Sequence, residues 1–281
     1  MITYERQKEI LNLLRTKDSL TVQSLCAKLY ASPATVRRDL AQMEREGLII
    51  RVRGGAALRD TRSRDTPFLL RSSINLEKKE AIAQLVLPLI RGCSCVMMDS
   101  STTTAAVARL LSGFHDLTVI TNGLPAIAAL NEYSDARVIC TGGAVKNNSS
   151  LLGEAAAETV SRYCADAFLF SCRGVDAQQG VTDADEEVAA LKRRMMSRSK
   201  LKILLCDSTK FSASFLCRVC SLSEIDVLVS NAPHPKPFLR AFGAGLCIPA
   251  VPNKPFLSCA GIFSRQSGEK RRQIKAPHRL L

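Results

Sequence analysis

Near the start of the chain the sequence runs Ser32-Pro33-Ala34-Thr35-Val36-Arg37-Arg38-Asp39-Leu40, which predicts a helix with a well-defined first turn. Ser32 is a favoured N-cap residue, and Pro33 falls at the first helical position, where a missing N–H costs nothing. Apolar residues at helical spacing then form one buried stripe: Val36, Leu40 and Met43. The rest of the helix surface is small, hydroxylated and cationic: Ala34, Thr35, Arg37, Arg38 and Arg45.

Two further helices are predicted upstream of this one. The helix predicted within residues 20–29 has Thr21, a favoured N-cap residue, at its start. It carries a stripe of apolar residues: Val22, Leu25 and Leu29. An earlier helix is striped by Ile10, Leu13 and Leu14. Two short helices joined by a tight turn, with arginines on the second, are typical of a helix-turn-helix, whose second helix enters the major groove of DNA.

After Gly47 the pattern changes from helical spacing to alternation. Ile50-Arg51-Val52-Arg53 alternates apolar and basic residues and then meets Gly54-Gly55, which predicts a strand and a turn, the wing of a winged helix. Its arginines project from one face toward DNA phosphates. A structural helical domain with a solvated charged face is the alternative interpretation. The ordered set of signals favours DNA binding, through Thr21, Ser32, Ala34, Thr35, Arg37, Arg38, Arg51, Arg53 and Gly54.

Length and charge set the broad class. The 281 residues suggest two domains. The net charge of +13 is concentrated at the two ends, and a basic head fits a nucleic-acid partner. No secretory leader and no apolar run long enough to cross a membrane are evident, so we expect a cytoplasmic protein with reduced cysteines. Cys217-x-x-Cys220 lacks companion ligands, and we expect neither a metal nor a cofactor.

Four segments are predicted along the chain: a winged helix-turn-helix domain at 1–57, a polar linker at 58–76, an α/β domain at 77–232 and a tail at 233–281. In the third segment, helical stretches at 78–90, 104–111 and 125–130 alternate with apolar runs. Strands are expected at 95–99, 117–121, 137–140, 167–170, 201–206 and 225–229. This alternation predicts a doubly wound domain with a largely parallel sheet.

Polar residues follow several of the predicted strands, at the edge where such sheets bind ligands. The first strand is followed by hydroxyl residues that open a helix, an arrangement suited to phosphate. The candidates are Asp99, Ser100, Ser101, Thr102, Thr103, Thr121, Asn122, Gly142, Gly143, Lys146 and Lys210. Taken singly, each has a simpler reading as a helix cap, a turn or a surface lysine. Their joint placement at strand ends favours a small-ligand pocket.

These motifs resemble the DeoR family of bacterial transcriptional regulators. The resemblance rests on the Thr-Val-Arg-Arg-Asp-Leu run, on the Gly-Gly-Ala that ends at Ala56, and on marks up to about Asn231. The later marks include Asp99-Ser100-x-Thr102-Thr103, Gly174-x-Asp176 and Asp207-Ser208-x-Lys210. The resemblance implies a sugar-phosphate-sensing domain similar in fold to ribose-5-phosphate isomerase. It also implies that the hydroxyl loop holds the phosphate, with Lys210 and Asp176 at the same site. Ser101 stands where the family usually has glycine.

The leading hypothesis is a repressor that a phosphorylated sugar releases from operator DNA, acting as a homo-oligomer, dimer or tetramer, with no membrane partner. A transcriptional activator is the first alternative. A sugar-phosphate isomerase-like enzyme with a DNA-binding head is the second, because carboxylates lie close in sequence to Lys192: Asp183, Asp185 and Glu186. Acidic residues at a helix start need no catalytic role, so we expect no enzyme. The family would close with a helix and a strand, whereas 233–281 is proline-rich and cationic, which predicts a divergent, mostly disordered tail.

Overall fold

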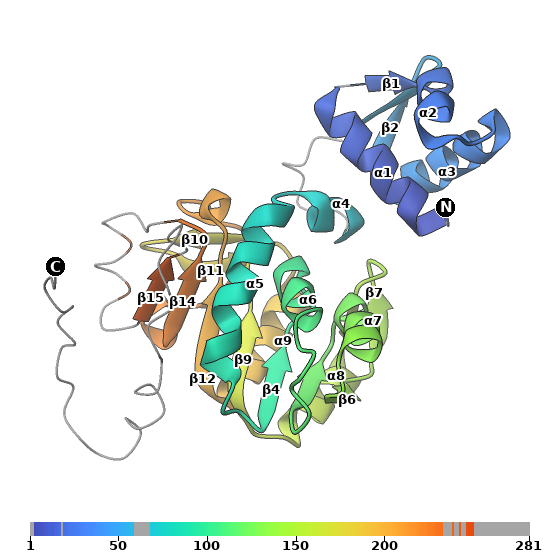
Figure 1. The fold of residues 1–281 in the computed structure, drawn as a ribbon. Helices are drawn as coiled ribbons and strands as arrows, with labels where there is room; N and C mark the ends of the chain where they lie inside the picture. The colour runs from blue at the N-terminus through green and yellow to red at the C-terminus, as the bar shows by residue number, and fades with distance from the viewer. Residues whose placement is uncertain are drawn as a thin grey trace, which may run out of the picture. The chain divides into compact units, whose positions relative to one another are not determined.

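The computed structural model describes residues 3–17, 19–58, 68–232, 238, 242 and 246–249 (Figure 1). The N-terminal part contains three helices, α1 (Thr3–Thr16), α2 (Val22–Leu29) and α3 (Pro33–Arg45). Its three short antiparallel strands, β1 (Ser19–Thr21), β2 (Ile49–Val52) and β3 (Gly55–Leu58), lie in the order β1-β3-β2. This arrangement is the predicted helix-turn-helix with a wing.

The predicted caps and stripes of this part are confirmed. The Thr21 hydroxyl accepts from the Ser24 amide at 3.1 Å, and the Ser32 hydroxyl accepts from the Thr35 amide at 3.2 Å. The apolar stripes of α2 and α3 are buried. In α1 the stripe differs slightly from the prediction, because Leu11 is fully buried and Leu13 is only half-buried.

The following part is built on a seven-stranded, wholly parallel sheet with the order β15-β14-β12-β9-β4-β5-β6. These strands are β4 (Cys95–Met98), β5 (Thr118–Thr121), β6 (Arg137–Cys140), β9 (Ala165–Phe170), β12 (Ser199–Leu205), β14 (Val227–Ser230) and β15 (Leu246–Pro249). The chain runs outward from β4 to β6 and then returns to the other side of β4. The sheet therefore has a topological switch point between β4 and β9, where α/β sheets bind ligands.

Helices cover both faces of this sheet, as the doubly wound prediction requires (Figure 1). They are α5 (Leu76–Ile90), α6 (Thr102–Ala108), α7 (Leu124–Tyr133), α8 (Glu154–Ser161) and α9 (Glu186–Ser197). The core beneath α8 and α9 contains the stacked rings of Phe168 and Phe170, whose centroids are 4.8 Å apart. Both rings are fully buried, so this face of the sheet is a packed interior rather than a binding surface.

Two small antiparallel units were not predicted. One pairs β7 (Ala144–Lys146) with β8 (Ser150–Leu152). The other orders β10 (Gly174–Asp176), β11 (Gly180–Asp183) and β13 (Cys217–Cys220) into a separate sheet. Both leave the main sheet at the carboxyl ends of its strands, so they add walls around the switch point.

Two segments hold ordered elements that were not predicted. The stretch 58–76, predicted as a linker, contains the helix α4 (Phe68–Ser73) and the first residue of α5. Of the tail at 233–281, predicted to be mostly disordered, the structure describes six residues: Phe238 and Phe242 are buried with helical backbone, and Leu246–Pro249 form β15 alongside β14. Apolar residues spaced by four, followed by a short strand, are enough to pack on this sheet despite the prolines around them. Residues 250–281 lie outside the described part.

Candidate functional site

A cavity of about 270 Å³ opens at the switch point, beside the loops that follow β4, β9 and β12. Its described lining includes six basic side chains: Arg71, Lys79, Lys146, Arg173, Lys192 and Lys210. Three carboxylates also line it: Asp183, Asp185 and Asp207. The excess of positive charge favours an anionic ligand, because a low-dielectric cavity strengthens every charge interaction within it.

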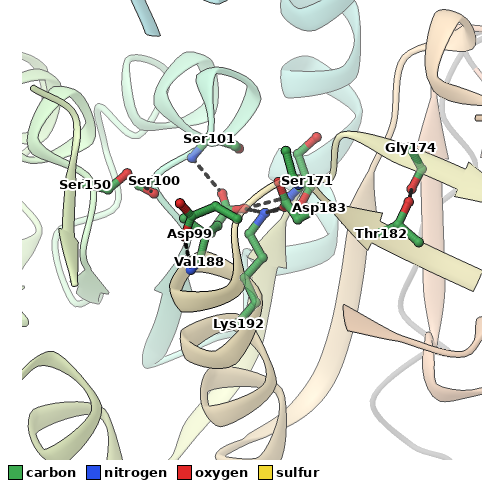
Figure 2. A network of polar contacts seen from close by, with 12 residues as sticks. Asp99, Ser100, Ser101, Ser150, Ser171, Gly174, Thr182, Asp183, Val188 and Lys192 are labelled. Atoms are coloured by element: carbon green, nitrogen blue, oxygen red, sulfur yellow. Dashed lines mark hydrogen bonds and ion pairs between the residues drawn. The ribbon is translucent and has the colours of Figure 1, made fainter. Parts of the chain in front are cut away.

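A buried ion-pair cluster forms the floor of this region (Figure 2). Lys192 on α9 places its Nζ 2.6 Å from Asp183 Oδ2 and 3.0 Å from Asp99 Oδ2. The same ammonium donates to the Ser171 carbonyl at 2.6 Å. Burial disfavours the charged lysine, but the two carboxylates outweigh it and raise the pKa of Lys192. The cluster therefore joins β4, β9, β11 and α9 through fixed charges.

The hydroxyl loop after β4 is less open than the sequence suggests. Asp99 Oδ1 accepts from the Ser101 amide at 3.0 Å and from the Thr104 hydroxyl at 2.9 Å, so the protein's own carboxylate occupies part of the predicted anion cradle. The Ser101 hydroxyl caps α6 by accepting from the Thr104 amide at 3.2 Å. Ser100, Ser101 and Thr102 nevertheless line the cavity, and Ser100 accepts from the Ser150 hydroxyl at 2.7 Å.

The two predicted lysines both line the cavity and both have partners. Lys146 lies 2.7 Å from Asp185 and 2.5 Å from Glu187, which raise its pKa. Lys210 Nζ donates to the Ser171 hydroxyl at 2.8 Å and lies 3.7 Å from Asp207. Because Ser171 also accepts from Lys192 through its carbonyl, one residue after β9 links the two lysines.

The other predicted residues do not line this cavity. Asp99, Thr103, Thr121 and Asn122 are each at most 3% exposed and lie behind the loop as packing or hydrogen-bonding groups. Gly142 and Gly143 lie in the loop between β6 and β7 with φ values of 68° and 103°, which favour glycine. Asp176 accepts from the amides of Gln178 and Gln179, so it closes the turn between β10 and β11.

Sequence reasoning missed several cavity residues on α4 and at its junction with α5. Arg71, Ile74 and Asn75 all come from the stretch interpreted as a linker. Asn75 donates to Thr209 at 3.1 Å and takes a left-handed backbone, φ 53°, which Asn tolerates better than most residues. Arg173 and Phe215 come from the loops around the unpredicted second sheet. The sequence did contain a signal for this part of the cavity. Phe68, Arg71 and Asn75 come directly before the helix α5.

The predicted DNA-binding residues gather on the exposed side of α3 and on the wing. Arg37 and Arg38 are exposed, as are Ser32 and Ala34, while Thr35 is half-exposed. Arg51 is exposed on β2, Arg53 and Gly54 are exposed on the turn between β2 and β3, and the Arg51 guanidinium donates to the Gly55 carbonyl at 3.3 Å. Thr21 is exposed and acts as a helix cap.

The helix-turn-helix itself is held together from inside. Arg6 on α1 donates to both oxygens of Asp39 on α3, at 2.5 and 3.0 Å, and Asp39 is 2% exposed. The aspartate of the Arg-Arg-Asp run therefore orients α3 and leaves the two arginines before it for an outside partner.

Metal-binding and membrane-spanning features are absent from the described residues. They contain no group of three or more His, Cys, Asp or Glu side chains that could hold a metal ion. None of their helices is long and apolar enough to span a membrane.

A winged helix with two exposed arginines, followed by a parallel-sheet domain with a cationic cavity, is the architecture of a transcriptional regulator. Residues 6–62 match the DeoR-like helix-turn-helix domain, and residues 74–232 match the DeoR C terminal sensor domain. The chain belongs to the DeoR family of transcriptional regulators.

Relatives agree with this assignment. The HTH-type transcriptional regulator GolR of Listeria innocua is 34% identical over 248 residues, which cover 88% of this chain and 98% of that protein. The glycerol-3-phosphate regulon repressor of Escherichia coli is 30% identical, covering 82% and 92%. The HTH-type transcriptional repressor GlcR of Bacillus subtilis is 32% identical, covering 82% and 89%. These three are named as regulators or repressors, not enzymes.

A solved ribose 5-phosphate isomerase from Methanocaldococcus jannaschii is also similar, with 14% identity and a TM-score of 0.37 over 49% of this chain and 55% of that one. An overlap of this size supports no conclusion about function.

Proposed function

We propose that this regulator is a repressor that leaves its operator when a phosphorylated sugar binds in the switch-point cavity. The observation that carries the proposal is the cavity's lining: six basic side chains against three carboxylates, with serine and threonine hydroxyls beside them. Cationic and hydroxyl donors suit a phosphate, and carboxylate and amide oxygens suit sugar hydroxyls.

Different segments of the lining carry these two kinds of group. Lys210 and the hydroxyls of Ser100 and Thr102 lie on the loops after β12 and β4, and they suit the phosphate. Asp185 and Asn75 carry acceptor oxygens on other walls of the cavity and suit sugar hydroxyls. The volume of about 270 Å³ is just below the roughly 300–1,000 Å³ of pockets for drug-sized ligands, which favours a ligand smaller than those.

The DNA-binding half of the proposal rests on α3 and the wing. Arg37 and Arg38 are exposed at the start of a helix that a helix-turn-helix inserts into the major groove, where arginine pairs with guanine edges. Arg51 and Arg53 suit phosphate contacts. We propose that the regulator binds paired half-sites as a homo-oligomer, dimer or tetramer, in the cytoplasm.

The name of one relative, the glycerol-3-phosphate regulon repressor, adds support for a phosphorylated effector and for repression. That name describes the relative's own regulon. The experiment below is needed to identify the sugar phosphate that binds the present chain.

The test begins by selecting an operator from random duplexes with the full chain. Mobility shifts on that operator are then repeated with a panel of sugars and sugar phosphates, each phosphorylated compound beside its free parent. We expect one phosphorylated compound to release the operator and its parent to leave the complex intact. No sequence preference, no release by any phosphorylated compound, or tighter operator binding with ligand would overturn the proposal, and the last result would indicate an activator.

A further inference from the structure

Tyr30 stands at the junction of α2 and α3, and its side chain is almost entirely in solvent. It is the C-cap residue of α2 and has left-handed backbone angles, φ 51° and ψ 40°. Its amide donates to the Cys26 carbonyl, which closes the last turn of α2. The side chain is 96% exposed. The tight turn of the helix-turn-helix therefore presents an aromatic ring and a phenol to the outside.

The backbone and the side chain of Tyr30 have different roles. A helix that ends in a left-handed residue usually has glycine or asparagine there, because a bulky side chain makes this conformation strained. The turn between α2 and α3 thus needs the left-handed angles and does not need the ring. At 96% exposure, the ring buries too little surface for packing to offset the strain. Strained residues whose side chains do not support the fold are typical of binding surfaces.

The position of Tyr30 in the helix-turn-helix indicates what it contacts. In this motif the second helix enters the major groove with its N-terminal residues, while the first helix crosses the DNA backbone. Tyr30 ends the first helix and comes two residues before Ser32, the cap of the second. When α3 occupies the groove, this turn lies at the rim of the groove, which is lined by phosphates.

Other polar groups at the start of α3 are engaged with one another. The Ser32 hydroxyl accepts from the Thr35 amide at 3.2 Å and lies 2.9 Å from the Thr35 hydroxyl. The exposed phenol of Tyr30 lies outside this cap. A phenol is a hydrogen-bond donor, and tyrosine is among the side chains that donate to phosphate oxygens in protein–DNA complexes.

We propose that the Tyr30 phenol donates a hydrogen bond to a phosphate oxygen of the operator, at the rim of the groove that α3 enters. Contacts of this kind fix the register of a protein on the duplex and carry no sequence information. This inference rests on the proposed function, because it requires α3 to be the recognition helix. It adds an uncharged backbone contact to the cationic ones expected from Arg51 and Arg53.

Mobility shifts with the full chain test the hydroxyl. Tyr30→Phe should weaken binding to the operator and to an unrelated duplex alike, by about ten-fold, because a charge-assisted hydrogen bond is lost. The dependence of binding on salt should keep its wild-type slope, since a neutral phenol releases no counterion. Tyr133→Phe is the matched control and should bind like the wild type, because Tyr133 is 46% exposed on α7, outside the winged helix.

Operators with single neutral methylphosphonate linkages test whether the partner is a phosphate. At one position in each half-site, the neutral linkage should weaken binding of the wild type and of Tyr133→Phe by about ten-fold. The same linkage should hardly change binding of Tyr30→Phe, which has already lost the contact. Wild-type affinity in Tyr30→Phe, or equal sensitivity of the wild type and Tyr30→Phe at every position, would overturn the inference.

Tyr30→Gly separates a binding role from a structural one. Glycine adopts left-handed angles without strain, so this variant should be at least as stable to heat as the wild type. Its affinity for DNA should nevertheless fall at least as far as that of Tyr30→Phe. A lower thermal midpoint in Tyr30→Gly would show that the side chain supports the fold, and would count against the inference.

Failure of this inference can be distinguished from failure of the proposed function. A wild-type chain that prefers its operator, with Tyr30→Phe unaffected, would remove the Tyr30 contact and leave the proposed function standing. Loss of binding in Tyr30→Phe, with no operator release by any sugar phosphate, would leave the contact standing and remove the effector mechanism. A wild-type chain with no preference for any duplex would contradict both.

Discussion

Lys192 Nζ lies 2.6 Å from Asp183 Oδ2, with both side chains under 10% exposed. This ion pair ties α9 to the end of β11 and continues to Asp99 at the end of β4. One ammonium therefore joins β4 to the β11–α9 segment, which is distant from it in the sequence (Figure 2).

Replacing Lys192 with Met should destabilise the sensor domain by about 3–5 kcal/mol, because it leaves two buried carboxylates without their counter-charge. Chemical denaturation measures this loss. Lys200→Met is the matched control: Lys200 is mostly exposed and pairs with Asp166 at 2.9 Å, so its loss should cost under about 1 kcal/mol. Equal losses in the two variants would show that the buried cluster carries no special share of the stability.

Asp99 gives the sensor domain a defined response to acid. Burial raises the pKa of Asp99, but Lys192, the Ser101 side chain and the Ser171 amide outweigh burial and lower it. A lowered pKa stabilises the fold above the unfolded value of ~3.9, and that stabilisation disappears as the pH falls through the folded value. Between pH 6 and pH 3 the thermal midpoint of the wild type should fall more steeply than that of Asp99→Asn. Parallel curves would contradict this assignment.

Asp39→Asn should weaken the helix-turn-helix by about 1.5–3 kcal/mol, because it removes the charge that accepts two hydrogen bonds from Arg6. Operator affinity should fall with it, since α3 loses its attachment to α1. Glu44→Gln, at an exposed position on the same helix, is the control and should change neither property. Full operator affinity in Asp39→Asn would argue against a positioning role for the ion pair.

The two groups of arginines should separate in DNA-binding measurements. Arg37→Ala or Arg38→Ala should cost ~1–3 kcal/mol on the operator and flatten the preference for it over other sequences. Arg51→Ala or Arg53→Ala should weaken all sequences alike and make binding less sensitive to salt. Mobility shifts at several salt concentrations make the comparison, and undiminished preference in both α3 variants would show that α3 is not the recognition helix.

Lys210→Ala should give a repressor that still binds its operator and no longer responds to the effector. Its ammonium lines the cavity and holds the Ser171 hydroxyl at 2.8 Å, well away in sequence from α3 and the wing. Lys200→Ala is the exposed control and should respond like the wild type. A reporter gene under the operator reads both variants, and normal induction of Lys210→Ala would remove this lysine from the site.

The sequence predicted the winged helix closely because its signals are local. The caps at Thr21 and Ser32 and the stripe that contains Val36 are properties of single helices, and they fix the helix boundaries without reference to the rest of the fold. The parallel sheet was also predictable, since each buried strand is a short apolar run between helical stretches.

The cavity was harder to predict because tertiary contacts define it. The position of Asp99 after a strand indicated a binding loop, but its carboxylate turns inward to Lys192 and to the loop's own amides. Arg71 lies in a polar stretch that resembles a linker, and tertiary hydrogen bonds of Lys79 and Asn75 tie the end of this stretch to the sensor domain. Phe238 and Phe242 were likewise not predicted as core residues, because the prolines near them in the sequence indicate disorder and only their tertiary packing shows that they are buried.

The most direct test of the account is calorimetry of the full chain with the compound that releases the operator and with its unphosphorylated parent. The account predicts that the phosphorylated form binds at least about 100-fold more tightly, as two or more charge-assisted contacts to one phosphate require. Equal affinities for the two forms would show that the cationic cavity does not recognise phosphate, and would contradict the account.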